Sequence, residues 1–321
     1  RHLGGGRDVD DAPAITEYGF DEYRSTWESP DPDPVLTSGN WIWKPEDSVK
    51  RWDRTAYFVD HTLRFLREHP DEPCFINLWP DDVHTPWVPY ADEIDEKQDW
   101  FRLRNLPPVL SELDQQIGRL INELEEMGQL ENTLIIFTSD NGPAPSFERL
   151  RANGLRGVKN SLYEGGINMP FFVHWPAQIK AGQVDSSSLL ASIDLLPTLC
   201  RLTETALPSS HRLDGEDVSN TFLTGQTYRR QQPIFFEYGR NERYNYPKDS
   251  ADRSLQLAVR STKWKLYTTP DGSSVELYDL ASDPKESQEV SASHPDLVQE
   301  LKPLLIEWFE QNDQSLISRE K

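Results

Sequence analysis

Asp140 and Asn141 are candidate metal ligands in this sequence. They lie in the run Thr138-Ser139-Asp140-Asn141-Gly142. The two residues directly follow an apolar run that predicts a strand, and ligands of open α/β sheets bind beyond the carboxyl ends of strands. A carboxylate beside an amide carbonyl offers two oxygen ligands for a hard divalent cation such as Ca²⁺ or Mg²⁺. Asp-Asn-Gly is also favourable turn chemistry. Taken alone, the run leaves a metal site and a plain turn both open.

Two histidines could take part in proton transfer or anion binding. His84 lies in the loop that follows the apolar run 74–79. Its imidazole could donate to an anionic oxygen, and a surface loop histidine is the alternative. His2 precedes three glycines and indicates little by itself.

A lysine and an arginine lie in a glycine-rich segment downstream. Arg156 and Lys159 flank Gly157, and Gly165 and Gly166 follow shortly after. Glycines on both sides of cationic residues favour a backbone folded tightly around an anion. A solvated loop is the alternative for this segment.

The elements expected to position these residues alternate between strands and helices. Short apolar runs predict buried strands at 74–79, 133–138 and 169–175, and apolar residues at helical spacing predict helices at 53–67, 109–127 and 189–202. The last of these helices is expected to be interrupted at Pro197, whereas Gly128 ends the second. Apolar strands separated by helices predict an α/β fold with a mainly parallel sheet and helices on both faces.

The pattern changes after about residue 230. Short strands are predicted at 234–236, 255–259, 264–267 and 275–278, with a hairpin turn at 270–272 and a closing amphipathic helix at 295–312. We therefore predict two domains: residues 1–229, and a C-terminal subdomain at 230–321 formed by a small antiparallel sheet and a helix.

The composition narrows the classes of partner. Among the 321 residues, 54 are acidic and 33 are basic, which gives a net charge of −21. This charge argues against a nucleic acid or an anionic membrane surface as the main partner, and it requires local cations to attract any anionic substrate. No run approaches the ~18 apolar residues of a membrane span. Cys74 and Cys200 are more typical of buried thiols than of a disulfide, so they do not indicate a compartment.

Together, in this order, the motifs resemble the sulfatase family of the alkaline-phosphatase superfamily, over nearly the whole chain from residue 1 to about 310. His2-Leu3-Gly4 is similar to the end of the family's G-K-x-H-L-G, and residues 75–86 to its strand and histidine loop. Thr138 to Gly142 is similar to the metal-binding S/T-D-N-G. Residues 156–166 resemble R/K-G-x-K…E-G-G, and residues 277–286 resemble the C-terminal L-Y-D-L-x-x-D-P-x-E.

The resemblance implies roles for these residues. Asp140 and Asn141 would be ligands of Ca²⁺, with Mg²⁺ as a possible substitute. His84 and Lys159 would contact the sulfate, and either one of them would assist departure of the alcohol. Arg156 would belong to the same substrate-binding loop as Lys159. His2 would position or deprotonate the diol of a formylglycine nucleophile.

The sequence departs from the family pattern in one important respect. The family makes its formylglycine within C/S-x-P-S-R, and neither Cys74 nor Cys200 lies in such a motif. The formylglycine and a further pair of metal-binding aspartates are expected upstream of Arg1, so the chain is interpreted as an N-terminally truncated piece. We expect these 321 residues alone neither to hydrolyse a sulfate ester nor to bind Ca²⁺ tightly.

Substrate and location are less closely defined. Trp87 stands where many relatives carry a second histidine. Trp27, Trp41, Trp43 and Trp52 could stack on the rings of a sulfated sugar or pack within an insertion. The family implies a periplasmic or secreted protein. A phosphoric ester hydrolase of the same superfamily and a non-catalytic sulfatase-like binding protein are the alternatives, and the residues upstream of Arg1 would discriminate between them.

Overall fold

The computed structural model describes residues 13–26, 31–36, 48–91, 99–145, 149–208, 212–239 and 246–319, with side chains up to residue 312. The chain forms two compact units, Arg1–Glu131 and Asn132–Lys321. Within the described residues, no helix has both the length and the apolar character that crossing a membrane requires. His2, Trp27, Trp41 and Trp43 lie outside the described residues.

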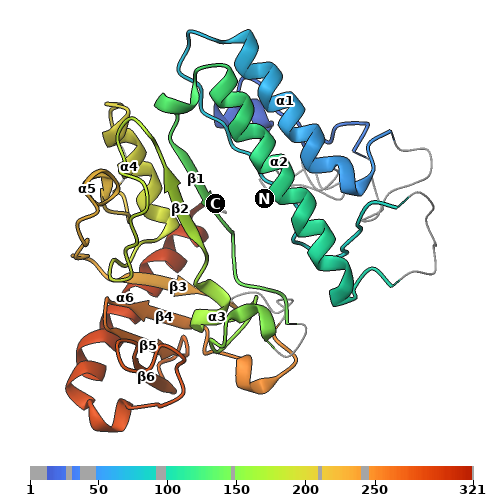
Figure 1. The fold of residues 1–321 in the computed structure, drawn as a ribbon. Coiled ribbons are helices and arrows are strands. Elements are labelled where there is room, and N and C mark those ends of the chain that lie inside the picture. The colour runs from blue at the N-terminus through green and yellow to red at the C-terminus, as the bar shows by residue number, and fades with distance from the viewer. Residues whose placement is uncertain are drawn as a thin grey trace. The chain divides into compact units, whose positions relative to one another are not determined.

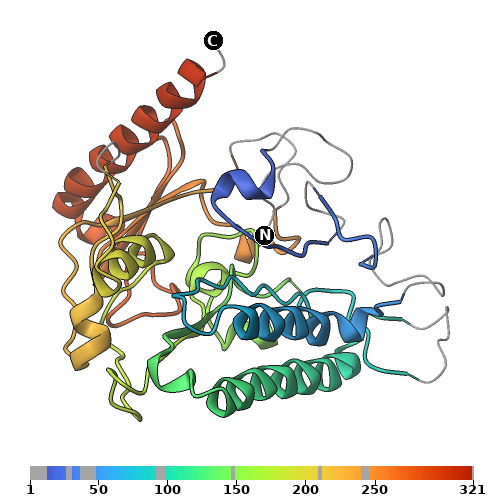
Figure 2. The ribbon, with the colours of Figure 1, turned by 90° about the horizontal axis from the view of Figure 1, so that it is seen from above.

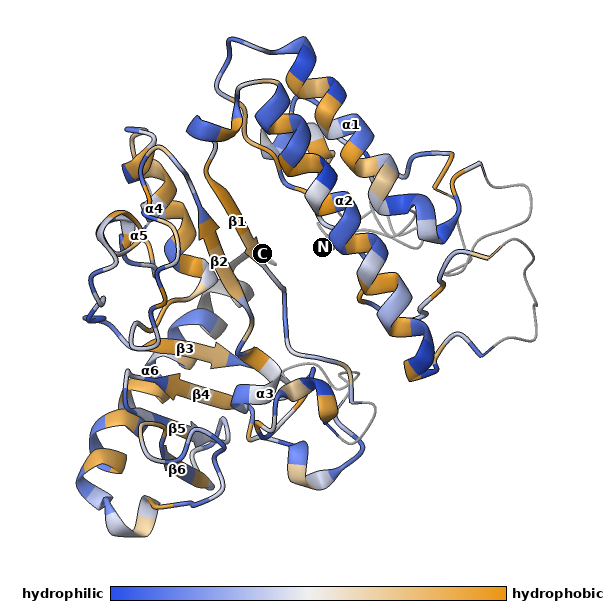
Figure 3. Cartoon of the chain, viewed as in Figure 1, coloured by the Kyte–Doolittle hydropathy of each residue, from blue (hydrophilic) through white to orange (hydrophobic). Residues whose placement is uncertain are grey.

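The first unit is built on two long helices, α1 (Arg54–Glu68) and α2 (Leu106–Glu126), which lie side by side in Figures 1 and 2. Apolar and hydrophilic residues alternate along both helices, as Figure 3 shows. Their buried residues recur at helical spacing: Val59, Leu63 and Leu66 on α1, and Val109, Leu113 and Leu124 on α2. Shorter 3-10 helices are Ile15–Tyr18, Arg51–Asp53, Leu103–Asn105 and Leu130–Asn132.

Both predicted helices of this unit are confirmed. Helix α2 begins before the predicted position because Pro107 and Pro108 occupy its first turn, where a missing N–H removes no helical hydrogen bond. It ends as predicted, since Gly128 adopts φ +70° just beyond it.

The predicted strand at 74–79 is wrong. No strand is assigned there, and the side chains of Phe75 and Trp79 are 65% and 51% exposed. An apolar run forms a strand only where a neighbouring strand pairs with it, and the described part of the first unit contains none.

The second unit begins with a pair of strands, β1 (Ile135–Thr138) and β2 (Phe171–His174). Both strands were predicted, but they run antiparallel, with Ile135 opposite His174 and Thr138 opposite Phe171. The expectation of buried, parallel strands is therefore wrong for this pair. A parallel pair needs a long crossover, usually a helix, whereas the only α-helix among the described residues of the connection is the four-residue α3 (Glu164–Ile167).

Two further helices follow, α4 (Leu195–Leu202) and α5 (Ser219–Thr224). The helix predicted at 189–202 starts late, and Pro197 lies in its first turn rather than interrupting it. The buried carboxylate of Asp194, just before α4, pairs with Arg230 at 2.6 Å and also accepts hydrogen bonds from the backbone N–H groups of Ala191 and Glu216. These bonds connect the start of α4 to the segment before β3.

A four-stranded antiparallel sheet completes the unit, in the order β3 (Ile234–Glu237), β4 (Leu257–Arg260), β5 (Trp264–Thr268) and β6 (Val275–Asp279). These strands and the closing helix α6 (Pro295–Arg319) confirm the predicted subdomain elements, and Gly272 adopts φ +68° in the predicted hairpin turn. The domain division between residues 229 and 230 stays a prediction. The remaining 3-10 helices are Leu150–Ala152, Ser192–Asp194, Ser250–Asp252 and Ser291–Ser293.

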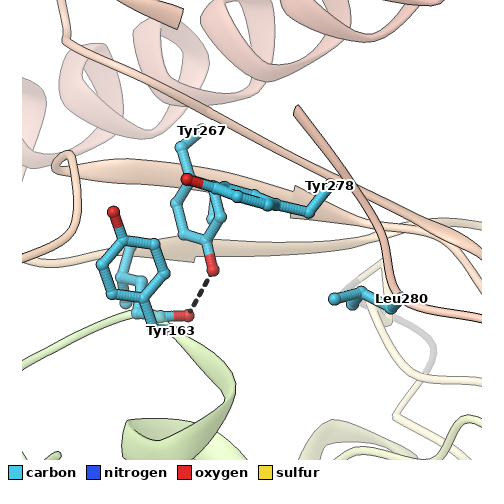
Figure 4. Packing of buried hydrophobic residues seen from close by; sticks show 6 residues of the cluster. Tyr163, Tyr267, Tyr278 and Leu280 are labelled. Atoms are coloured by element: carbon cyan, nitrogen blue, oxygen red, sulfur yellow. Dashed lines mark hydrogen bonds between the residues drawn. The ribbon is translucent and has the colours of Figure 1, made fainter. Parts of the chain in front are cut away.

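The two faces of this sheet are covered differently. On one face, Leu257, Leu266 and Leu277 pack with Leu301 and Leu305 of α6. On the other face, Ala258, Tyr267 and Tyr278 pack against Leu162 and Tyr163, which precede α3; Figure 4 shows these tyrosines together. This second face of the sheet therefore packs against the segment that contains Lys159.

Candidate functional site

Asp140 and Asn141 form the turn that immediately follows β1. Asp140 is exposed and Asn141 is half-buried. The hydroxyl of Ser139 donates to the carbonyl oxygen of Asn141 at 3.3 Å, and the N–H of Gly142 donates to the carbonyl oxygen of Gly166 at 2.8 Å. The turn is thus anchored at its downstream end.

Three glycines allow the turn and the downstream segment to meet through their backbones. A Cβ atom on Gly142 would lie 2.1 Å from the carbonyl oxygen of Gly165, and one on Gly166 would lie 2.1 Å from that of Ser161. A Cβ atom on Gly165 would lie 2.2 Å from the carbonyl oxygen of Gly157. Contacts this short exclude any side chain at these positions.

Lys159 is joined to the same turn. Its backbone N–H donates to the carbonyl oxygen of Pro143 at 2.7 Å, and its side chain is half-buried. The structure therefore brings together the two segments that contain Asp140, Asn141 and Lys159, and backbone hydrogen bonds connect them.

Arg156 begins the segment that contains Lys159, and its guanidinium lies against the C-terminal sheet. The guanidinium stacks on the ring of Tyr163, 3.8 Å from the ring centroid. Its Nη1 donates to the hydroxyl of Tyr278 at 2.9 Å and to the carbonyl oxygen of Glu286 at 3.0 Å, and its Nε donates to Ala251. These contacts hold the segment in place, and a role of Arg156 in substrate binding stays a prediction.

A buried group of charges lies at the other end of the segment. Lys265, a fully buried lysine of β5, donates to Glu164 at 2.8 Å and to the carbonyl oxygen of Leu162 at 2.7 Å. Burial raises the pKa of Glu164, but Lys265 and Arg260 lower it more, so the net pKa falls below its usual value. Burial raises the pKa of Glu286, and its net pKa stays raised although Lys265 and Tyr267 oppose the change.

The sequence did not assign roles to Lys265, Glu164 or Glu286. Glu164 and Glu286 were visible within the E-G-G and D-P-x-E motifs. Lys265 had a weaker signal, a charged residue inside a predicted apolar strand. Such a residue indicates a buried partner of opposite charge, since an unpaired buried charge is costly.

His84 belongs to the first unit, in a loop held by Arg51. The buried guanidinium of Arg51 donates to the carbonyl oxygens of Asp81 and His84 at 3.0 Å each and to that of Pro86 at 3.2 Å. Nδ1 of His84 lies 2.6 Å from the carbonyl oxygen of Thr85. A carbonyl can only accept, so Nδ1 carries the proton and Nε2 is the basic nitrogen of the neutral ring.

Two aspartates beside His84 differ in their charge state. Burial raises the pKa of Asp81, but ion pairs with Arg51 and Arg54 lower it more, so the net pKa is below the usual value. Burial raises the pKa of Asp82 to about 6, although the hydroxyl of Thr55 donates to its carboxylate. The loop therefore contains one firmly ionised carboxylate and one that titrates near neutrality.

Comparison with known proteins identifies the family. The model of the family described as "Sulfatase" matches residues 16–205, more than half of the chain. The chain belongs to the sulfatase family. A second model, described as the C-terminal part of N-sulphoglucosamine sulphohydrolase, matches residues 158–311 of this sulfatase-family chain.

Individual relatives agree with this assignment. An N-acetylgalactosamine-6-O-sulfatase of Bacteroides thetaiotaomicron is 30% identical over 289 residues, which are 82% of this chain and 51% of the relative. Human arylsulfatase A is 34% identical over 61% of this chain and 41% of its own length. The sulfatase-family chain thus spans about half the length of the curated relatives that it matches.

Solved structures support the fold. A Bacteroides thetaiotaomicron protein from a study of glycosaminoglycan metabolism has a TM-score of 0.64 and 29% identity, over 82% of this chain and 54% of its own. A putative sulfatase of Bacteroides fragilis has a TM-score of 0.61 at 20% identity, over 82% of this chain and 59% of its own. The chain therefore has the α/β, alkaline-phosphatase-like fold predicted from its sequence.

The residues of this sulfatase-family chain fit only part of a calcium site. Asp140 and Asn141 offer a carboxylate and an amide oxygen, but Ca²⁺ takes about six to eight oxygen ligands. Within the described residues, no group of three or more His, Cys, Asp and Glu side chains could hold a metal ion. The two residues fit the oxygen chemistry of Ca²⁺ without completing its ligand set, so no catalytic step is assigned to a metal.

Proposed function

We propose that the protein is a sulfuric ester hydrolase that acts on a sulfated carbohydrate or an aryl sulfate. One observation carries the proposal: the Asp140-Asn141 turn and the Lys159 segment are joined by the bonds from Gly142 to Gly166 and from Lys159 to Pro143. A cation and oxygen ligands held by rigid backbone suit a group-transfer reaction, which depends on positioning and on electrostatic stabilisation of an anion.

Each residue has a proposed part in this reaction. In the overall hydrolysis, the bond between sulfur and the ester oxygen breaks, water supplies the new oxygen on sulfur, and the ester oxygen leaves as an alcohol. The ammonium of Lys159 would contact the sulfate and stabilise its charge. His84 would act as a general acid in its doubly protonated form, giving the proton on Nε2 to the leaving oxygen while Nδ1 stays bonded to Thr85. Lys159 is the second candidate for this step.

Finer parts of the proposal come from the family. They are Ca²⁺ dependence through Asp140 and Asn141, a formylglycine nucleophile served by His2, inactivity of these 321 residues alone, and a periplasmic or secreted location. A sulfated sugar as substrate is supported by the N-acetylgalactosamine-6-O-sulfatase. It is also supported by a solved relative in complex with its substrate D-glucosamine-2-N,6-O-disulfate, at a TM-score of 0.51 and 26% identity.

The test is a screen of the whole protein against sulfated monosaccharides, 4-nitrophenyl sulfate and 4-nitrophenyl phosphate. We expect sulfate release from at least one sulfate ester, and a loss of about 10²- to 10³-fold in kcat for Lys159→Ala. Lys180→Ala, at an exposed lysine of the same unit, is the matched control and should keep full activity. Hydrolysis of the phosphate ester alone would favour the phosphoric ester alternative, and binding without turnover would favour a sulfatase-like binding protein.

A further inference from the structure

Glu286 contacts both ends of the segment that contains Lys159. Its backbone carbonyl oxygen accepts a hydrogen bond from Nη1 of Arg156 at 3.0 Å. Its carboxylate Oε2 accepts a hydrogen bond from the backbone N–H of Glu164 at 2.7 Å. Lys159 lies between Arg156 and Glu164, so one residue from beyond β6 joins the start of the segment to its end.

The carboxylate of Glu286 is itself held in one orientation. Oε1 accepts a hydrogen bond from the hydroxyl of Tyr267 and lies 3.5 Å from Nζ of Lys265. Lys265 and Tyr267 lie two residues apart on β5, on the same side of the sheet, and both are fully buried. The strand therefore fixes the carboxylate, and the carboxylate fixes the segment.

This arrangement is costly, which argues that it has a purpose other than stability. Glu286 is fully buried and adopts φ +52°, a left-handed conformation that few residues other than glycine take. Replacing a buried ion pair by apolar residues is often neutral or stabilising. A buried carboxylate that accepts a backbone N–H instead sets the position of that backbone.

We propose that Glu286 is a positioning residue for Lys159, acting from the C-terminal sheet through the backbone of Glu164 and the guanidinium of Arg156. This inference rests on the proposed function, in which Lys159 contacts the sulfate. Glu286 does not touch the substrate in this role. It sets the path of the segment between residues 156 and 164, and so the place from which the lysine side chain extends.

The first test is hydrogen exchange of the whole protein carrying Glu286→Gln. An amide side chain has one acceptor atom instead of two and carries no charge, so the N–H of Glu164 and the hydroxyl of Tyr267 can no longer both donate to it, and the ion pair with Lys265 is lost. We expect amide exchange in residues 157–166 to accelerate about tenfold, with exchange in β4 and β5 unchanged. Glu289→Gln is the matched control, because this carboxylate also accepts backbone N–H groups, from Leu277 and Ser291, but does not touch the segment.

The second test is kinetic. With the sulfate ester that the whole protein hydrolyses, we expect Glu286→Gln to lower kcat by about 10- to 100-fold and Glu289→Gln to leave it unchanged. Tyr267→Phe keeps every charge and removes two bonds of this hydroxyl, one to the Glu286 carboxylate and one at 3.1 Å to the carbonyl oxygen of Leu162. It should accelerate the same amides by a smaller factor, and the diagnostic amide is that of Glu164, which donates to Glu286. This variant carries the test if Glu286→Gln does not fold.

The outcomes separate the two proposals. Unchanged exchange in residues 157–166 in both variants overturns the positioning role, and so does acceleration spread evenly over the whole unit. Local acceleration in a protein that hydrolyses no sulfate ester supports the positioning of the segment and overturns the proposed function.

Discussion

The backbone N–H of Gly142 donates to the carbonyl oxygen of Gly166 at 2.8 Å, and neither glycine has room for a Cβ atom. The obstacle on each side is a backbone carbonyl oxygen, that of Gly165 or of Ser161, which cannot rotate away as a side chain would. The turn with the candidate metal ligands and the segment with the candidate lysine are therefore in direct backbone contact. A shift of either one must move the other.

A methyl group at this contact should destabilise the second unit. For Gly142→Ala we expect a loss of about 1–3 kcal/mol in the free energy of unfolding, because the new Cβ atom would displace backbone. Gly118→Ala is the control, since nothing lies within 4 Å of a Cβ atom there. It should stabilise α2 by about 0.5–1 kcal/mol. Urea unfolding of both variants measures the effect, and an unchanged midpoint for Gly142→Ala would contradict the tight contact.

Asp82 should make stability fall as pH rises towards neutrality. Its native pKa of about 6 exceeds the ordinary aspartate value of 3.8, so the native state binds the proton more tightly than the unfolded state. The stabilisation is complete below pH 3.8 and is lost as pH rises through about 6. We expect Asp82→Asn, which stays neutral, to be more stable than wild type by about 1–3 kcal/mol above pH 7.

Chemical unfolding at about pH 4.5 and about pH 7.5 tests this expectation, because the two values lie about 1.5 units below and above the native pKa of about 6. Asp114→Asn, at an exposed position of α2, serves as the comparison and should show no such difference. The prediction is contradicted if wild-type stability rises with pH across this range and Asp82→Asn is no more stable than wild type. That result would show that interactions of the ionised Asp82 carboxylate offset the cost of its burial.

Removal of Lys265 should leave two buried carboxylates short of a partner. For Lys265→Met we expect a loss of about 3–5 kcal/mol, because Glu164 and Glu286 lose the ammonium between them. The double variant Lys265→Met with Glu286→Gln should recover part of the loss. Lys263→Met, at a half-exposed lysine before β5, should change stability by less than about 1 kcal/mol. Equal losses in the single and double variants would refute the coupling.

Arg156→Lys distinguishes a structural role of Arg156, in holding the segment against the sheet, from a role in binding substrate. A lysine cannot keep both the stack on Tyr163 and the two bonds from Nη1, so we expect thermal stability to fall by about 1–2 kcal/mol. Arg201→Lys, at an exposed position on α4, is the matched control. If stability is unchanged and only KM for the sulfate ester rises, the guanidinium acts on substrate instead.

The sequence predicted the elements whose signals are local. The spacing of Tyr57, Phe58, Leu63 and Leu66 was sufficient to predict α1. The turn at Gly272 was sufficient to predict the hairpin between β5 and β6. The strand at 74–79 failed because pairing depends on a neighbour that the run itself does not contain. The parallel order failed for β1 and β2 because it was inferred from strand and helix alternation alone.

In the candidate site, too, the features with local sequence signals could be predicted and the long-range contacts could not. Asp140, Asn141, Lys159 and His84 were visible as residue types in short motifs. The contact of Gly142 with Gly166 could not be predicted, since it joins positions far apart in the sequence through backbone atoms. The path from Glu286 to Glu164 was equally inaccessible, because it requires knowing which side chains are buried together.

The dependence of the lysine segment on β5 and Glu286 has a consequence for protein engineering. Chimeras between relatives usually exchange parts at a domain boundary, which here would be the predicted division at residues 229 and 230. That cut would pair one parent's segment 156–164 with another parent's Lys265, Tyr267 and Glu286. A crossover upstream of Arg156 would take the segment 156–164 and its partners on the sheet from the same parent. The C-terminal family match begins at residue 158, so it includes both Lys159 and the sheet that supports it.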